Sequence, residues 1–134
     1  KPIQGAFSNL SQWQSVGLSH GGVTYSFVVN YFGAADYLGT GSSGVPGHIP
    51  GSYQFTPASS LDLNEMLNRL PTDMPIVVYC WTSQTSSQVA AYLNMLGYEA
   101  YSLKFGSNNL FYDNLTAHKW SGAADFPLET TPVN

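Results

Sequence analysis

The sequence has little charge, and basic residues are its scarcest charged type: four Lys and Arg stand against eight Asp and Glu in 134 residues. The four cations are spread along the chain, at Lys1, Arg69, Lys104 and Lys119. Nucleic acids and anionic membrane surfaces require a concentrated basic face, so neither is expected as a partner. A small anion that binds here must be held mainly by backbone N–H groups, hydroxyls or helix ends.

Cysteine is also scarce, because Cys80 is the only one in the chain. A single thiol excludes an intrachain disulfide, a Cys-x-x-Cys redox pair and a zinc site built on several thiolates. The three histidines, His20, His48 and His118, have no informative spacing to one another or to carboxylates, so we expect no metal and no other cofactor. A serine hydrolase is not expected either, since no Gly-x-Ser-x-Gly motif occurs.

Long apolar runs are absent too, since none approaches the roughly 20 residues that a membrane-spanning helix needs. We therefore expect no membrane insertion. The chain begins with Lys1 and shows no signal peptide, so we expect that any targeting segment has been removed. The low charge and the abundance of Ser, Thr, Gly, Asn and Tyr favour a bacterial periplasmic or otherwise exported location over a cytoplasmic one.

The length and the 43% hydrophobic fraction indicate a single domain over 1–134, with a core over about 23–122 and ends that wrap the surface. Its clearest unit begins with the β-branched apolar run 76–79, which predicts a strand buried on both faces, as in a parallel sheet. Apolar residues at helical spacing then predict a helix from near Ser86, capped by Gly97. Because 100–103 predicts a further strand, the unit is a right-handed βαβ motif.

Shorter patterns outline the elements before this unit. Residues 25–29 predict a strand that ends at Asn30. The Gly-, Ser- and Pro-rich stretch 33–51 is mostly loop, with a turn of helix at 36–38. Residues 60–71 predict a helix that begins with a serine N-cap and ends at a proline. Strands that alternate with helices predict an α/β sandwich.

In such a sheet, ligands bind beyond the carboxyl ends of the strands, and Cys80 stands at the end of 76–79. A thiol reacts as its thiolate, and a free cysteine with a pKa near 8.5 is only about 3% ionised at pH 7. Lowering that pKa by two units takes about 2.7 kcal/mol of preferential stabilisation of the anion. The alternative interpretation is a buried, inert cysteine that packs as a small hydrophobic residue.

The loop after Cys80 contains no Lys, Arg or His that could stabilise a thiolate. The remaining sources are backbone N–H groups that curl around the sulfur and the positive end of the following helix. Hydroxyl groups can add hydrogen bonds, and the loop offers four of them, on Thr82, Ser83, Thr85 and Ser86.

Two stretches of this sequence carry a resemblance to a known family. Residues 75–98 read PIVVYCWTSQTSSQVAAYLNMLGY, and residues 47–52 read GHIPGS. The first looks like the active-site strand, loop and helix of rhodanese-like sulfurtransferases. The second is similar to that family's GHIPGA motif, with Ser52 in place of Ala. The spacing between the two also fits, and the resemblance spans Val28 to Tyr112, about two-thirds of the chain.

The resemblance implies a three-layer α/β sandwich with a five-stranded parallel sheet flanked by helices. It implies that Cys80 takes sulfur from a small anionic donor such as thiosulfate, a persulfide or a polysulfide, and carries it as a persulfide to a thiol or cyanide acceptor. In the family, the histidine at the place of His48 supports the loop, so His48 is assigned to structural support. Asn30, at the end of its strand, is assigned the same role. The loop residues expected to bind substrate are Trp81, Thr82, Ser83, Gln84, Thr85 and Ser86.

The sequence departs from the family close to this site. Asn30 and Phe32 stand where rhodaneses often have an Asp-x-Arg pair, so both charges are missing together and neither is left unpaired. The loop's frequent glycine is Ser83, which puts its left-handed backbone turn in question. A basic residue often present in the loop is also missing. Thiosulfate, a dianion, is therefore expected to be a poorer donor than a persulfide or polysulfide.

Three residues near the same sheet edge have two interpretations each. Lys104 follows the strand that ends at Leu103, and it is the candidate cation for attracting the donor; the alternative is a solvated surface lysine. Trp81 and Phe105 either wall the pocket or simply pack. Lys104 is included among the predicted substrate-binding residues.

Two other functions compete with an active sulfurtransferase. One is a non-catalytic or partner-dependent module of the same fold that binds or carries sulfur. The other is a cysteine phosphatase or arsenate reductase, which needs an arginine six residues after the cysteine to clamp the oxyanion. Ser86 occupies that position, so the sequence argues against the phosphatase.

Overall fold

The computed structural model describes residues 27–41, 47–62 and 67–122. Four strands in this part of the chain form one sheet in the order β2-β1-β3-β4, and every neighbouring pair is parallel. The central strands are β1 (Phe27–Asn30) and β3 (Ile76–Tyr79), and the outer ones are β2 (Tyr53–Gln54) and β4 (Ala100–Ser102). The predicted α/β fold with a parallel sheet is confirmed. The fifth strand that the resemblance implies is not among the described residues.

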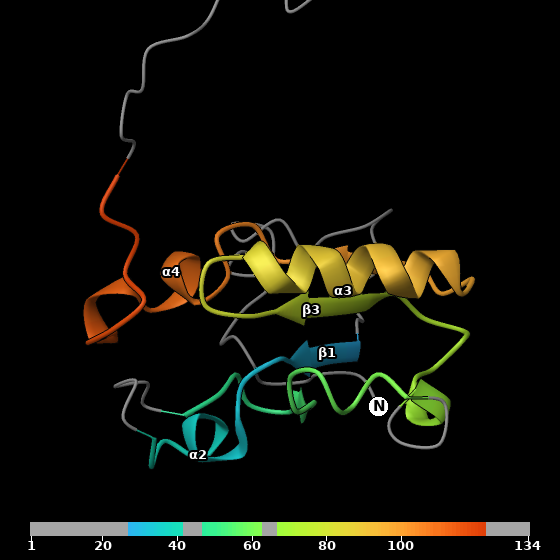
Figure 1. Cartoon of the computed structure of the whole chain (residues 1–134), viewed down its shortest axis with the longest axis horizontal. Coiled ribbons are helices and arrows are strands. Elements are labelled where there is room, and N and C mark those ends of the chain that lie inside the picture. The colour runs from blue at the N-terminus through green and yellow to red at the C-terminus, as the bar shows by residue number, and fades with distance from the viewer. Residues whose placement is uncertain (1–26, 42–46, 63–66, 123–134) are drawn as a thin grey trace, which may run out of the picture.

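Helices flank this sheet. Figure 1 shows the longest, α3 (Gln84–Met95), running along one face of the sheet over β3, while α2 (Ala34–Tyr37) lies on the opposite side of β1. The remaining helical elements are single turns: η1 (Leu67–Arg69), α4 (Ser107–Leu110) and η2 (Tyr112–Asn114). The chain therefore forms layers on both sides of the strands.

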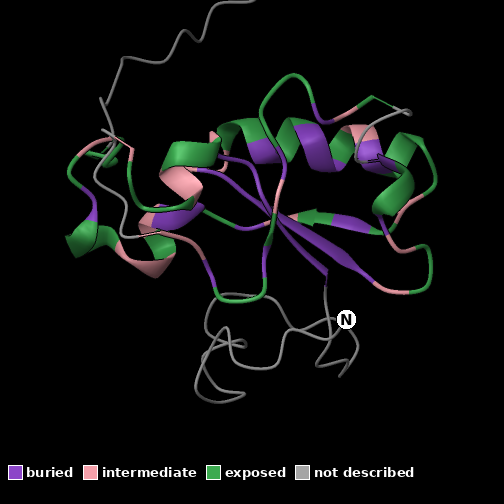
Figure 2. Cartoon of the chain, turned by 90° about the horizontal axis from the view of Figure 1, so that it is seen from below, coloured by how far each residue is buried: buried purple, intermediate pink, exposed green. Residues whose placement is uncertain are grey.

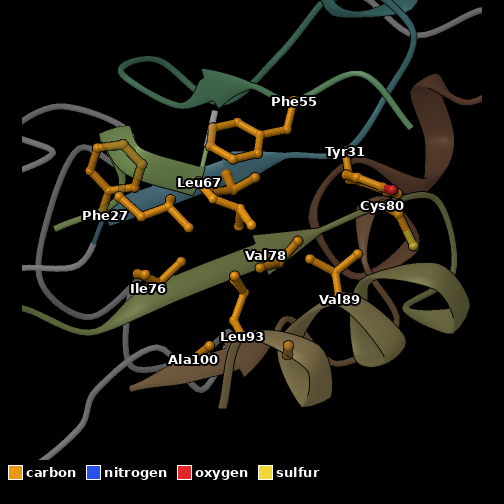
Figure 3. Close-up of a cluster of buried hydrophobic side chains, with 13 residues drawn as sticks. Phe27, Tyr31, Phe55, Leu67, Ile76, Val78, Cys80, Val89, Leu93 and Ala100 are labelled. Carbon is orange, nitrogen blue, oxygen red and sulfur yellow. The ribbon is translucent and has the colours of Figure 1, made fainter. Parts of the chain in front are cut away.

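Both faces of β3 are buried, as Figure 2 shows for the strands at the centre of the molecule. Ile76 and Val78 point into the cluster that includes Leu93 of α3, and Figure 3 shows these side chains facing one another. Val77 and Tyr79 belong to the cluster on the other face. A strand buried on both sides has no polar face, which is why its sequence is a continuous apolar run.

The predicted βαβ unit is confirmed with small shifts at its boundaries. β3 covers the predicted residues, and β4 ends one residue before the predicted limit. The helix α3 starts at Gln84, two residues before the predicted start. Gly97 caps it as expected: its φ is 94°, and the N–H of Tyr98 donates to the carbonyl of Leu93 over 3.0 Å.

The helix predicted over 60–71 is only partly visible, because 63–66 lie outside the described residues. Its described end is the 3₁₀ turn η1, and Ser60 lies in a turn in which its N–H donates to the carbonyl of Thr56. The short strand β2 was not predicted from the sequence. The predicted helical turn at 36–38 is present two residues earlier, as α2. Residues 25–26 of the first predicted strand and the chain ends predicted to wrap the surface also lie outside the described residues.

The direction of the connections reverses between β1 and β3, at the centre of the sheet. After β1 the chain goes to β2 on one side, and after β3 it goes to β4 on the other. In parallel α/β sheets, ligands generally bind beyond the carboxyl ends of the strands at such a point. Asn30 and Cys80 stand at these two ends, with Asn30 paired in register with Tyr79.

Candidate active site

The sulfur of Cys80 lies at the junction of β3 and the loop that leads to α3. Figure 3 shows the residue at the end of the buried cluster, with its sulfur pointing toward the start of α3. The backbone N–H of Ser86 donates to the sulfur over 3.4 Å, and the thiol donates to Ser86 Oγ over 3.4 Å. Cys80 is 1% exposed, so the thiol lies below the surface and has polar partners there.

The surroundings favour the ionised form of this thiol. Burial raises the pKa of Cys80, but hydrogen bonds to the sulfur from the hydroxyls of Ser86 and Thr85 and from the backbone N–H groups of Ser86 and Thr82 outweigh it. The net result is a pKa below the ordinary value of a cysteine. The loop itself contains no cation, so it stabilises the anion with N–H and O–H dipoles.

The loop makes its turn at Ser83, which has φ 77° and ψ −6° and directly precedes α3. This is the left-handed conformation that the family's glycine suggests, and here a serine adopts it. A side chain in this region costs roughly 1–2 kcal/mol. The hydroxyl of Ser83 makes a 2.9 Å hydrogen bond to Ser102 Oγ on β4, which helps to offset that cost.

The segment after β4 fixes the cysteine loop from the other side. The N–H and the hydroxyl of Ser107 both donate to the carbonyl of Cys80, over 2.9 and 3.1 Å. The preceding Gly106 has φ 52°, and a Cβ there would lie 2.2 Å from the same carbonyl oxygen. Asn108 Nδ2 donates to the carbonyl of Trp81 over 2.8 Å. Of the twenty residue types, only glycine at position 106 permits its backbone to approach the Cys80 carbonyl so closely.

The Trp81 side chain takes part in a stack of rings. The centroid of its ring lies 3.9 Å from that of the Phe32 ring and 4.8 Å from that of the His118 ring, and both rings stack on it. Phe105 lies apart from this stack, 5.5 Å from the ring of Trp120, and is 43% exposed. Trp81 thus joins the loop to the end of β1, and Phe105 belongs to a different surface group.

The structure does not bring all the predicted substrate-binding residues together. Ser86 touches the sulfur, and Thr82 and Thr85 contribute hydrogen bonds to it. Gln84 is exposed in the first turn of α3. The Lys104 ammonium is exposed and lies 5.2 Å from the centroid of the Phe105 ring. Within the described residues, no hydrogen bond or ion pair joins Lys104 to the cysteine loop.

Asn30 and His48 have contacts of the kind expected for supporting residues. Asn30 is fully buried, and its Nδ2 donates to the Tyr79 hydroxyl over 2.7 Å. The N–H of Ile49 donates to the same hydroxyl over 3.0 Å, which ties the GHIPGS segment to the strand of the cysteine. His48 stacks on the Tyr37 ring at 3.6 Å, and its Nδ1 lies 2.7 Å from the Tyr37 carbonyl. Burial raises the pKa of Tyr79, so it stays a neutral hydrogen-bonding group.

Sequence reasoning missed Ser102 and the segment Gly106–Asn108. Ser102 is a polar residue in a predicted strand, and only the pairing of β4 with β3 reveals that it lies beside the loop. Gly106 could have been suspected, since a glycine after a strand often marks a close backbone approach. Nothing in the sequence pattern connects Asn108 with Trp81.

Neither a metal centre nor a membrane span emerges from the described residues. No group of three or more His, Cys, Asp and Glu in them could hold a metal ion. None of their helices has the length and apolar character to cross a membrane.

The fold and the site together define a class of protein: a parallel α/β domain with a buried cysteine at the carboxyl end of a central strand, facing a helix start. The chain belongs to the rhodanese-like domain family, since the family model "Rhodanese-like domain" matches residues 34–111. That family includes sulfurtransferases and many members that are not catalytic. Comparisons with curated proteins and with solved structures found no match.

Proposed function

We propose that the protein is a sulfurtransferase that carries sulfane sulfur on Cys80. The Cys80 thiolate attacks the outer sulfur of the donor. With thiosulfate, the S–S bond of the donor breaks and its electron pair leaves on sulfite, while a persulfide anion forms on Cys80. Cyanide then attacks the outer sulfur of the persulfide, which releases thiocyanate and returns the thiolate; a thiol acceptor gives a new persulfide in the same way. Both steps conserve charge and need no external oxidant.

The observation that carries this proposal is the pair of contacts between Ser86 and the Cys80 sulfur. They support an anionic sulfur at the start of α3, where the helix dipole also favours negative charge. The lowered pKa of Cys80 agrees with this geometry. A cysteine that only filled space in the core would need none of these polar partners.

The absence of a cation from residues 81–87 bears on the choice of donor. Thiosulfate carries two negative charges, and the loop offers only neutral dipoles to hold them. A donor that carries less negative charge near the transferred sulfur needs less electrostatic stabilisation from the loop. We therefore propose a persulfide or polysulfide as the better donor and thiosulfate as the slower one.

A second candidate function is a sulfur carrier that depends on a partner or has no catalytic turnover. The observation in its favour is the 1% exposure of Cys80, which restricts a free donor's approach to the sulfur. In this function, a partner protein delivers or collects the sulfur directly at the loop.

Intact-mass measurements separate these possibilities. The protein is incubated with thiosulfate or with polysulfide, and a gain of one sulfur atom is expected, followed by its loss on addition of cyanide or a thiol. Cys80→Ser is the matched control and should gain nothing. Loading and release with both small molecules supports the transferase. Loading without release by small acceptors supports the carrier, and an adduct that survives in Cys80→Ser contradicts both.

A further inference from the structure

A chain of three serine hydroxyls leads away from the Cys80 sulfur. Ser86 Oγ lies 3.4 Å from the sulfur and 2.8 Å from Ser102 Oγ. Ser102 Oγ in turn lies 2.9 Å from Ser83 Oγ. Ser86 is fully buried, whereas Ser102 and Ser83 are half-buried, so the chain runs from the interior toward the surface.

The three serines come from two separate elements. Ser83 and Ser86 belong to the loop and the first turn of α3, and Ser102 belongs to β4. Ser102 is therefore the link without which the other two hydroxyls are not joined. In either hydroxyl pair, either oxygen can be the donor.

We propose that Ser102 is a positioning residue, which aligns the Ser86 hydroxyl on the Cys80 sulfur and connects that sulfur to solvent through Ser83. This inference deepens the proposed function and rests on it, because it concerns how the Cys80 thiolate is formed and held. Ser102 itself does not touch the sulfur and acts through Ser86.

The chain has two arrangements that match the two states of the sulfur. With a protonated thiol, Cys80 donates to Ser86, Ser86 to Ser102 and Ser102 to Ser83, whose own proton faces solvent. When the thiol ionises, its proton passes to Ser86 Oγ, and each hydroxyl passes its former proton outward, so that one proton leaves from Ser83 to water. Every hydroxyl then points inward, and Ser86 donates to the thiolate. Each serine is neutral before and after, and one proton has moved to solvent.

Hydrogen bonds arranged head to tail strengthen one another in a buried site. Ser86 donates to the sulfur more strongly when its own oxygen accepts a bond from Ser102. Among the described residues, no cation lies at the sulfur to stabilise the anion, so the hydrogen bond from Ser102 to Ser86 contributes more to that stabilisation. The hydrogen bonds that lower the pKa of Cys80 include the one from the Ser86 hydroxyl, in agreement with the geometry.

The same chain gives a reason for a serine at position 83. The backbone there is left-handed, and a glycine would adopt it without strain. Serine is strained in this conformation but supplies the outer hydroxyl of the chain. Position 83 therefore carries a serine, which suits the left-handed backbone less well than glycine, and its hydroxyl bonds to Ser102.

The experiment measures the rate of alkylation of Cys80 by iodoacetamide as a function of pH in the full chain. In Ser102→Ala, we expect the midpoint of the profile to rise, so that the rate near pH 7 falls about three- to fivefold while the limiting rate at high pH does not fall. Ser102→Thr keeps a hydroxyl and should restore most of the rate. The matched control is Ser87→Ala, because that hydroxyl donates to the Gln84 carbonyl and not to the chain.

Ser83→Gly gives an independent test that does not depend on the folding of Ser102→Ala. It removes the outer hydroxyl but relieves the left-handed strain, so the protein should be at least as stable as wild type to urea while its alkylation midpoint rises. A role in packing alone cannot produce that combination. If the midpoints of Ser102→Ala and Ser83→Gly equal that of the wild type, the inference is overturned. If the wild-type midpoint itself is that of an ordinary thiol, the proposed function loses its support as well.

Discussion

The side-chain amide of Asn30 donates a 2.7 Å hydrogen bond to the hydroxyl of Tyr79, and the two residues are register partners on the central strands. Asn30 Oδ1 also accepts the N–H of Phe32 over 3.0 Å, at the place where rhodaneses often carry a charged pair. A hydrogen bond between two uncharged side chains therefore links β1 to β3 directly before Cys80. It fixes the end of β3, from which the Cys80 side chain projects.

The Tyr79 hydroxyl is the centre of this buried network, so removing it should destabilise the fold. Tyr79→Phe leaves Asn30 Nδ2 and the N–H of Ile49 without their partner. We expect a loss of about 1–3 kcal/mol in the free energy of unfolding, measured by urea denaturation. Tyr112→Phe is the control, because its hydroxyl bonds to the Trp120 carbonyl at the surface, and its loss should stay within about 0.5 kcal/mol. Equal losses for both variants would contradict the assigned role.

Gly106 is required by close contact and not only by its backbone angle. In Gly106→Ala, the new Cβ would meet the Cys80 carbonyl at 2.2 Å, so we expect a loss of more than about 3 kcal/mol or a displaced loop that no longer loads sulfur. Gly97 also has a positive φ but has nothing within 4 Å of an added Cβ. Gly97→Ala should therefore cost only the backbone strain of about 1–2 kcal/mol and leave sulfur loading intact. Denaturation and intact mass together measure both effects.

The lowered pKa of Cys80 predicts a pH-dependent contribution to stability. Between the folded-state pKa and the unfolded value, the unfolded chain binds the proton that the folded chain has released, so stability rises with pH. The contribution is complete above the unfolded value of about 8.5 and is lost as the pH falls through the folded-state pKa. Compared with Cys80→Ala, the wild type should gain stability from acidic to alkaline pH. A difference that does not change with pH would show an unperturbed thiol.

Lys104 remains a prediction as the cation that attracts the donor, and Lys119 provides its matched control. Each ammonium lies over an aromatic ring, Lys104 over Phe105 and Lys119 over Tyr112. If Lys104 attracts thiosulfate, Lys104→Gln should slow sulfur loading about two- to fivefold at low ionic strength, with a smaller effect at high salt. Lys119→Gln should change the rate less. Equal rates for the two variants would identify Lys104 as a solvated surface lysine.

The sequence by itself determined the elements whose signals are local. The continuous apolar run 76–79 predicts β3 because a strand buried on both faces has no polar side. The helical spacing of apolar residues after it predicts α3, and Gly97 predicts where α3 ends. Both signals depend only on residues a few positions apart in the sequence. The cysteine's place at a strand end, and with it the candidate site, also follows from this local order.

Only the tertiary structure decided which distant residues lie beside the cysteine loop. Ser102 joins the loop because β4 pairs in parallel with β3 and sets Ser102 opposite Val78, and Gly106 lies against the Cys80 carbonyl for the same reason. The turn at Ser83 kept its left-handed form although the residue is not glycine, with a partner on another strand. Parallel pairing brings together residues that are far apart in the chain, and the local pattern of apolar and polar residues does not encode that register.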